Sequence, residues 1–255
     1  MIGRKIVYKD TLDSTNNYIA NLSSKGEIKH GDVILAGKQT AGKGQREAKW
    51  DSEPYKNLIL SIFLDHVNLS VTHHFYLTQA VSLALIDFLK NYGSDFKIKW
   101  PNDIVHNASK IAGILIETQI ENGISDHYHI RNSIVGIGIN INQENFNEYN
   151  ATSLKLITQK EYQLQDLLFK LIETLNFRIN QLETLQFKTL NKEYLSDLWL
   201  YEQESRYQSK GIEFVGKIIG VDENGKLLIL EKESNKILSF ENKELLFLER
   251  FTHNY

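Results

Sequence analysis

The segment from Lys97 to Glu117 constrains the fold of this chain more than any other. It reads Lys-Ile-Lys-Trp-Pro-Asn-Asp-Ile-Val-His-Asn-Ala-Ser-Lys-Ile-Ala-Gly-Ile-Leu-Ile-Glu. Apolar residues alternate on both sides of the Trp-Pro-Asn-Asp tetrapeptide at 100–103, which predicts two strands that meet at a turn. Such a turn would hold an amide, a carboxylate and the ammonium of Lys110 on rigid supports. The same pattern also fits an ordinary strand-turn-strand unit with solvated charges, so spacing alone leaves both interpretations open.

Composition restricts the class of protein. A chain of 255 residues with 42% hydrophobic and 24% charged residues is typical of a globular protein with one large domain, alone or with a small one. The longest apolar run, Leu58 to Leu64, is too short to cross a bilayer, and Met1 to Asp10 carries charge where a signal peptide needs an apolar core. We therefore expect a cytoplasmic protein that does not associate with membranes.

Cysteine and net charge narrow the chemistry. The sequence contains no cysteine, which excludes disulfides, thiolate catalysis and cysteine-ligated metals. The net charge of -3 provides no general attraction to nucleic acid, so no nucleic-acid partner is expected. An anionic ligand would have to be held by local positive charge.

The N-terminal part predicts a strand, a helix and a second strand. Ile6 to Tyr8 is a short strand, and a helix is expected to begin near Ser14-Thr15-Asn16 and to end near Ser24. These three side chains favour an N-cap, in which a side-chain oxygen accepts a bond from a free helix-start amide. The same position also suits a polar ligand, and the two roles are compatible. Asp32 to Lys38 is the next strand.

A glycine-rich basic segment, Gln39 to Trp50, follows that strand. Gly42 and Gly44 would let backbone amides approach an anion, while Lys43, Arg46 and Lys49 add positive charge. Trp50 offers a flat face for stacking. The segment predicts a loop that binds a nucleotide phosphate, although a basic surface loop has the same composition and the Walker and dinucleotide patterns are absent.

The middle of the chain predicts further strands and helices. A helix from about His73 to Asn91, capped by Thr72, would bury an apolar stripe. The pair Glu121-Asn122 followed by a glycine predicts a hairpin, and the glycines of the returning strand indicate close approach of a ligand or a second backbone. The polar segment Gln143 to Ser153 is predicted to be a long mobile loop. The remaining predicted elements are strands at 57–64 and 111–120, a returning strand that ends with residues 134–142, and helices at 161–182 and 185–198.

The pattern changes near the C-terminus. Short strands at regular spacing predict a small β-barrel added to the main domain, with turns at 222–225 and 234–235. The predicted strands are Ile212 to Val221, Lys226 to Glu231, Lys236 to Phe240 and Leu245 to Glu249. We expect an α+β protein with a catalytic domain at 1–203 and a barrel domain at 204–255.

Taken together, the motifs resemble those of biotin-protein ligases. The order and spacing that carry the resemblance are those of Ser14-Thr15-Asn16, Gln39 with Gly42-Lys43-Gly44, Trp50, Lys99 to Asp103, Lys110 to Leu115, and Gly136 to Asn140. The resemblance is strong from Leu12 to about Asn142 and weak in the C-terminal barrel. It implies a mixed sheet flanked by helices, related to the class II aminoacyl-tRNA synthetase core, followed by an SH3-like barrel. It also implies a monofunctional type, because the chain begins at the first strand and leaves no room for an N-terminal DNA-binding module.

The resemblance further implies a two-step reaction. Biotin and ATP would give biotinyl-5'-AMP and pyrophosphate, with Mg²⁺ on the phosphates, and the biotinyl group would pass to a lysine of a biotin carboxyl carrier protein, such as that of acetyl-CoA carboxylase. The enzyme would be a monomer or a homodimer.

The same resemblance assigns roles to individual residues. The biotin-binding set is Ser14, Thr15, Asn16, Gln39, Gly42, Lys43, Gly44, Gln45, Lys110, Gly113 and Gly136. The set that binds ATP and the adenylate is Lys43, Arg46, Trp50, Asn102, Lys110 and Asn140, with Trp50 at the adenine. The catalytic set is Lys110, Lys43 and Asp103, and Asp103 with Asn140 would hold Mg²⁺. The segments 39–50 and 143–153 would close over the intermediate.

The basic loop departs from the family pattern, which commonly reads Gly-Arg-Gly-Arg-x-Gly-Arg-x-Trp. Lysine at position 43 keeps the charge but loses a two-pronged phosphate contact, Gln45 has no charge, and an acid stands at position 47. We hypothesise that Arg46 takes over an arginine's role and that the adenylate is held less tightly. Two alternatives remain: a lipoate or octanoate ligase of the same fold, whose Arg-Arg-x-Ser-Gly-Gly-Gly segment is missing here, and a non-catalytic biotin sensor.

Overall fold

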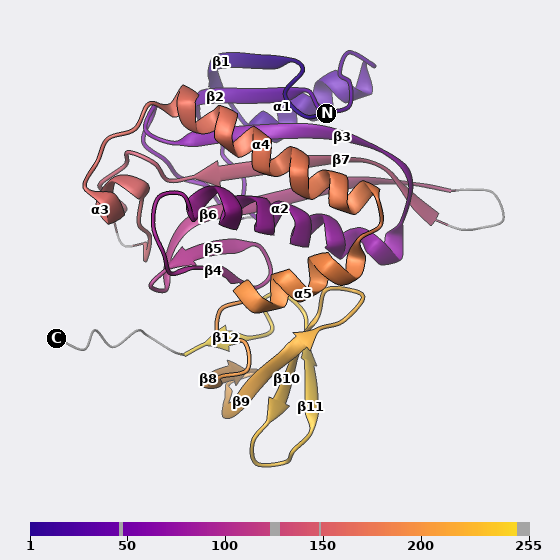
Figure 1. Cartoon of the computed structure of the whole chain (residues 1–255), viewed down its shortest axis with the longest axis vertical. Helices are drawn as coiled ribbons and strands as arrows, with labels where there is room; N and C mark the ends of the chain where they lie inside the picture. Colours follow the sequence, from indigo (N-terminus) through magenta and orange to yellow (C-terminus); the bar gives the residue numbers. More distant parts are fainter. Residues whose placement is uncertain (46–47, 123–127, 148, 249–255) are drawn as a thin grey trace.

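Two β-sheets organise the computed structural model, which describes residues 1–45, 48–122, 128–147 and 149–248. Within these residues the first sheet has seven strands in the order β1-β2-β3-β7-β6-β5-β4, and the second has five in the order β11-β10-β9-β8-β12. β1 pairs with β2 in parallel, and the other neighbours of the first sheet pair antiparallel. The mixed sheet with its helices and the smaller antiparallel sheet (Figure 1) confirm the predicted α+β class with an SH3-like C-terminal part.

The strands follow the predicted order, and several are longer than predicted. In the first sheet they are β1 (Ile6–Leu12), β2 (Val33–Gln39), β3 (Leu58–Ser70), β4 (Phe96–Lys99), β5 (Asp103–His106), β6 (Ser109–Asn122) and β7 (Tyr128–Ile139). In the second they are β8 (Glu204–Ser209), β9 (Ile212–Val221), β10 (Leu227–Glu231), β11 (Ile237–Phe240) and β12 (Leu246–Phe247). The glycine of the predicted β6–β7 turn lies outside the described residues, but the two strands pair antiparallel as expected.

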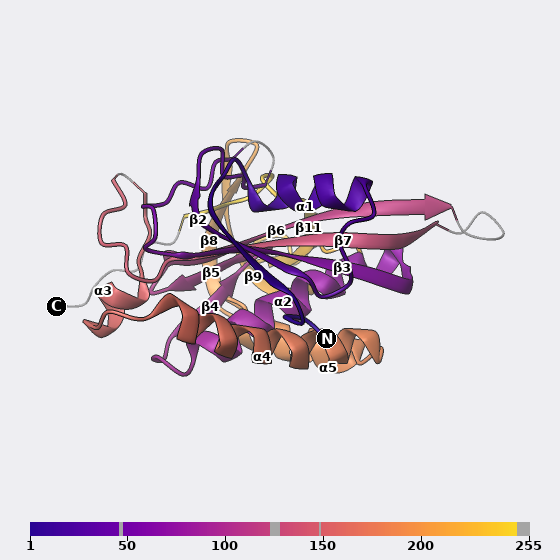
Figure 2. The ribbon, with the colours of Figure 1, turned by 90° about the horizontal axis from the view of Figure 1, so that it is seen from above.

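The helices cover both faces of the first sheet. α1 lies on one face, and α2, α4 and α5 lie on the other (Figure 2). They are α1 (Thr15–Ser24), α2 (His74–Leu89), α3 (Leu154–Thr158), α4 (Leu164–Glu183) and α5 (Phe187–Asp197), with a 3-10 turn at Val71–His73. No helix in the described part of the chain is long and apolar enough to cross a membrane.

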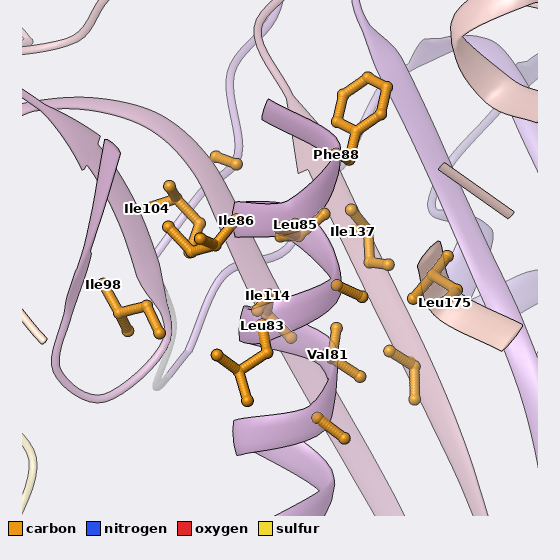
Figure 3. Close-up of a cluster of buried hydrophobic side chains, with 14 of the residues drawn as sticks. Val81, Leu83, Leu85, Ile86, Phe88, Ile98, Ile104, Ile114, Ile137 and Leu175 are labelled. Carbon is orange, nitrogen blue, oxygen red and sulfur yellow. The ribbon is translucent and has the colours of Figure 1, made fainter. Parts of the chain in front are cut away.

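The main core forms between α2 and the sheet. The predicted stripe of α2 meets β-strand residues such as Ile104, Ile114 and Ile137, with Leu175 of α4 beside them (Figure 3). Alternate residues of β3 divide between the faces: Leu60 and Ile62 join this core, while Phe63 packs under α1 in a smaller cluster. The face under α1 is therefore only partly filled by apolar groups, which leaves room there for a polar site.

The two sheets contact each other through the Trp-Pro-Asn-Asp turn. The indole Nε1 of Trp100 donates to the carbonyl oxygen of Gly225 at 2.9 Å, and both groups are buried. A Cβ on Gly225 would lie 2.4 Å from the ring of Phe75, so only glycine permits this approach. The second sheet is thus held against α2 and the β4–β5 turn. The predicted domain boundary at residue 203 stays a prediction, and β8 begins at Glu204.

Several local predictions were wrong. Ser14 occupies the N-cap position of α1, but its hydroxyl makes no capping bond, and the amide of Thr15 donates to the side-chain oxygen of Gln39. Thr72 does not cap α2, since Ser70 caps the preceding 3-10 turn. A second tight turn at residues 107–108, both with positive φ, separates β5 from β6. Neither α3 nor β8 was predicted.

Candidate active site

A cavity of about 210 Å³ lies beside the start of α1. Its walls come from five strands of the first sheet (β2, β3, β5, β6 and β7), from residues 43–45 and 48–50, and from a turn of the second sheet. Most of the predicted site residues meet here, although they are spread over more than a hundred positions. The predicted residues that line the cavity are Ser14, Thr15, Asn16, Gln39, Lys43, Gly44, Gln45, Trp50, Asn102, Asp103, Lys110, Gly113 and Gly136.

The register of the sheet explains the floor of the cavity. Asp103 lies opposite Gly113, and Gly113 lies opposite Gly138, so one row across three strands carries a carboxylate and two bare positions. Paired residues of antiparallel strands point to the same face. The ring of Trp50 covers the bare positions, and a Cβ on Gly138 would lie 2.4 Å from it.

The glycines of β7 therefore allow other side chains of this chain to lie close to the strand. The expected neighbours of such glycines were a ligand or a second backbone, yet Gly138 contacts Trp50, and Gly136 contacts Asn16 at 2.4 Å from the position of a Cβ. The indole nitrogen of Trp50 is buried and has no hydrogen-bond partner within the described residues. The adenine contact expected for Trp50 stays a prediction.

Lys110 and Asp103 form an ion pair at one end of the cavity. The ammonium Nζ lies 2.7 Å from the carboxylate Oδ1 of Asp103 and 5.6 Å from the ring centre of Trp50. A register shift in the β5–β6 pairing places Lys110 opposite Val105. Without this irregularity Lys110 would share the core-facing side with Ala112, because side chains alternate along a strand. The bulge thus turns the lysine toward the cavity.

A second lysine lies behind this pair. Lys99 is opposite Asp103 in the sheet, and its Nζ lies 5.5 Å from the ring centres of both Trp199 and Phe247. Burial lowers the pKa of the Lys99 ammonium, the carboxylate of Asp103 opposes this effect, and the charge of Lys110 adds to it. The ammonium groups of Lys99 and Lys110 are therefore both attracted by the single carboxylate of Asp103.

The opposite end of the cavity is uncharged and rich in hydrogen-bonding groups. Gln39 accepts from the Thr15 amide at 2.8 Å and lies 3.1 Å from the Thr15 hydroxyl. The hydroxyl of Ser61 lies 2.6 Å from that of Thr15 and 2.5 Å from the amide oxygen of Asn16. This end suits a neutral polar ring, whereas the Lys110 end suits anionic oxygens.

The basic segment closes one side of the cavity. A β-bridge between Lys43 and Lys49 and a bond from the Trp50 amide to the Gly42 carbonyl fold it back on itself. The ammonium of Lys43 donates to Asn17 at 2.6 Å. Gly42 itself is buried beneath this fold and does not line the cavity. Arg46, which the sequence assigns to the nucleotide, lies outside the described residues.

The described residues of the polar segment 143–153 form a loop, as predicted, and backbone bonds tie its later part to β6. Lys110 exchanges backbone bonds with Asn150 and Thr152. No described residue of this segment lines the cavity. Asn140 also lies outside the cavity lining, because its amide nitrogen donates to the carbonyl oxygens of Lys110 and Thr152. It braces this segment against β6, and the geometry offers no support for Asn140 as a ligand of metal or nucleotide.

Other residues of the site were not predicted. Ser61 carries the only hydroxyl in the apolar run of 58–64, and this isolated polar side chain in the sequence could have indicated a residue of the site. Asn242 and Lys243 line the cavity from the second sheet, and the amide of Asn242 donates to the side-chain oxygen of Gln45. Asn102 was predicted, and its amide anchors the turn by donating to the Ile114 carbonyl at 2.6 Å.

The model of the biotin/lipoate A/B protein ligase family matches residues 8–140. This match covers more than half of the chain and includes every strand that lines the cavity from the first sheet. The chain belongs to this family.

Three related proteins show how far the similarity extends along the chain. The bifunctional ligase/repressor BirA of Bacillus subtilis is 28% identical over 253 residues, which cover 96% of this chain and 75% of that protein. The biotin--[acetyl-CoA-carboxylase] ligase of Mycobacterium tuberculosis is 28% identical over 134 residues, covering 51% and 47% of the two chains. The biotin protein ligase of Aquifex aeolicus in complex with biotin and ATP has a TM-score of 0.73 at 26% identity, covering 95% and 98%.

Proposed function

We propose that this chain is an ATP-dependent biotin-protein ligase, which forms biotinyl-5'-AMP and transfers the biotinyl group to a lysine of a biotin carboxyl carrier protein. The observation that carries the proposal is the two-ended cavity in a member of this ligase family. One end offers hydroxyl and amide groups to a neutral polar ring, and the other offers Lys110 and Asp103. Biotin has this polarity, with a cyclic urea at one end and a carboxylate at the other.

The first step joins two anionic groups. A biotin carboxylate oxygen attacks the α-phosphorus of ATP, the bond to the β-phosphate breaks, and pyrophosphate leaves. Lys110 lies where it can neutralise charge that develops between carboxylate and phosphate, which is the main way a protein lowers such a barrier. Lys43 is the second candidate, and its ammonium would have to leave Asn17, to which it donates at 2.6 Å, to reach the phosphates.

Magnesium fits this site only with substrate oxygens completing its shell. The described residues contain no group of three His, Cys, Asp or Glu side chains that could hold a metal. Mg²⁺ commonly uses one or two carboxylates together with phosphates and water, so Asp103 alone would suffice from the protein. Bound there, the ion would neutralise phosphate charge.

The second step requires an uncharged amine. The acceptor lysine attacks the acyl carbon, the C–N bond forms, the bond to the phosphate oxygen breaks, and AMP leaves. The amine must lose protons on the way. Asp103 is our candidate to accept one, and the location of its carboxylate in the cavity lining beside Lys110 supports this role. The hypothesis that Arg46 retains the adenylate is tested by Arg46→Ala, which should release the intermediate faster.

One assay tests the proposal. The protein is mixed with ATP, Mg²⁺, an acceptor domain and either biotin or lipoate, and the acceptor is weighed by mass spectrometry. We expect a gain of one biotinyl group and no lipoyl group. A lipoyl gain would support the lipoate ligase, and tight biotin binding without any gain would support a sensor.

A further inference from the structure

We propose that Lys243, which the second sheet presents to the cavity, supplies the positive charge that the basic segment lacks at position 45 and thereby slows the loss of biotinyl-5'-AMP. The inference rests on the proposed function, because this intermediate forms only if the chain is a biotin ligase. The charge of Lys243 acts directly on the phosphate of the intermediate.

Position 45 lacks the charge that the family pattern commonly places there. The pattern has an arginine at this position, whereas this chain has the uncharged side chain of Gln45. Gln45 nevertheless lines the cavity, as an arginine there would. The cavity wall is therefore uncharged at a position where other family members have a cation, and an intermediate with an anionic phosphate would be held less strongly unless another residue supplies that charge.

A turn of the second sheet lies against this uncharged wall. The turn begins after β11 at Glu241, whose carbonyl oxygen accepts from the amide of Glu244 at 3.0 Å. Within the turn, the side-chain amide of Asn242 donates to the side-chain oxygen of Gln45. Asn242 and the next residue, Lys243, both line the cavity. A lysine therefore enters the site beside the residue that lacks a charge.

Contacts on both sides hold this turn in place. Lys226 forms an ion pair with Glu241, with 3.1 Å between Nζ and Oε1. Lys226 directly follows Gly225, whose carbonyl oxygen accepts from the buried indole of Trp100. On the other side of the turn, Leu245 is buried and belongs to the main core. The docking of the second sheet against the β4–β5 turn thus determines where this turn lies.

This corner of the cavity belongs to the end that suits anionic oxygens. Gln45, Asn102 and Asn242 line both this cavity and a neighbouring one, so they lie together at the boundary between the two. Asn102 directly precedes Asp103, whose carboxylate lies at the charged end of the cavity. Lys243 is therefore suited to the phosphate of the intermediate rather than to its uncharged ring.

The charges of the lining also favour an anion. Among the described residues that line the cavity, the charged side chains are those of Lys43, Lys49, Asp103, Lys110 and Lys243. Four ammonium groups thus accompany one carboxylate in a chain whose net charge is -3. Lys243 is exposed. Its attraction for the single charge of the adenylate phosphate is therefore that of unit charges in water, about a factor of 5 in affinity, and salt should screen it.

Release of the intermediate tests the proposal in the 255-residue chain. The protein forms the adenylate from labelled biotin, ATP and Mg²⁺, rapid gel filtration removes free ligand, and the loss of bound label is followed without an acceptor. Lys243→Gly removes the charge and suits the left-handed backbone of this position, where φ is 73°, so the turn should keep its shape. We expect release to be about fivefold faster at low salt, and the difference to vanish near about 1 M salt.

Lys210→Gly is the matched control. Lys210 is another exposed lysine in a turn of the second sheet, and its φ of 50° is also left-handed, but it lies outside the described lining of the cavity. This variant loses the same charge and should leave the release rate unchanged.

Two further variants separate charge from the shape of the turn. Lys243→Arg keeps the charge and should keep the release rate. Gln45→Arg, introduced into the chain that carries Lys243→Gly, returns a cation from the basic segment. This double variant should release the intermediate at close to the rate of the unaltered protein.

The outcomes separate this inference from the proposed function. An unaltered release rate in Lys243→Gly, an equal acceleration in Lys210→Gly, or an acceleration that persists at high salt would overturn the role of Lys243 while leaving the ligase proposal intact. Failure of Gln45→Arg to slow release in the Lys243→Gly chain would overturn the link to position 45. If the unaltered protein formed no adenylate, the ligase proposal and this inference would fail together.

Discussion

Replacing Lys110 by methionine should separate catalysis from stability. The ammonium lies 2.7 Å from Asp103, but the side chains of the pair are 38% and 27% exposed. Ion pairs that solvent reaches in this way contribute about 0–1 kcal/mol. The unfolding free energy should therefore change by less than about 1 kcal/mol. Methionine keeps the length and apolar contacts of the lysine stem, so contact with Trp50 is largely retained.

The effect on the first step should be much larger. In the proposed mechanism Lys110 meets charge that is absent in the ground state, and loss of one such preorganised group costs about 10²–10³ in rate. We expect adenylate formation, followed by pyrophosphate release at saturating biotin and ATP, to slow by this factor. Urea unfolding of the same preparation gives the stability.

Lys90→Met is the matched control. Its ammonium lies 2.9 Å from Asp197, and the pair is 50% and 16% exposed, so it resembles the Lys110 pair but lies away from the cavity. It should show the same small stability change with an unaltered rate. If Lys110→Met retained a third or more of the rate, or unfolded several kcal/mol more easily than Lys90→Met, the assigned role would be refuted.

Three further predictions concern other parts of the molecule. Trp100→Phe leaves the buried carbonyl of Gly225 without its partner and should lower the unfolding free energy by about 1–3 kcal/mol, measured by urea titration; an unchanged midpoint would contradict the importance of this contact. Gly136→Ala would place a Cβ 2.4 Å from the Asn16 oxygen, so calorimetry should show biotin affinity falling at least ~10-fold, and unaltered affinity would contradict it. Burial lowers the pKa of His66 to about 4 from 6.5, so the unfolded chain binds a proton first as pH falls. Stability should therefore decline between pH 6.5 and 4 by about 3 kcal/mol, and His66→Gln should remove that share of the slope in unfolding curves.

Much of the fold could be predicted because its signals are local. Alternation and helical spacing in the sequence found most strands and both long packing helices. Helix starts were less accessible: Ser14 takes the N-cap position of α1, but its hydroxyl makes no capping bond, and Gln39 from another strand accepts from the amide of Thr15. The partners that a side chain finds at a helix start depend on tertiary structure, which a sequence window does not contain.

The features of the site also divide into those that the sequence predicted and those that depend on tertiary structure. Residues in motifs, such as Asp103 and Lys110, could be predicted because their spacing is distinctive. The direction in which the Lys110 side chain points depends on a β-bulge, and no residue type in the sequence indicates that bulge. Lys243 reaches the cavity only because the second sheet docks beside it. The glycines of β7 were expected to allow close approach of a ligand or a second backbone, and the neighbours that the structure shows are the side chains of Asn16 and Trp50.

The positions of the tryptophans make intrinsic fluorescence a suitable probe of ligand binding in this protein. The chain has three tryptophans. Trp100 and Trp199 are each 6% exposed at the contact with the second sheet, where ligand should not alter their emission. Trp50 lies in the cavity wall, 5.6 Å from an ammonium that quenches or shifts indole fluorescence as it moves. Trp199 has a lysine ammonium at a similar distance, that of Lys99 at 5.5 Å, so Trp50→Phe would show which part of an emission change on titration with biotin or ATP comes from Trp50. Stopped-flow fluorescence could then follow each binding event without a label.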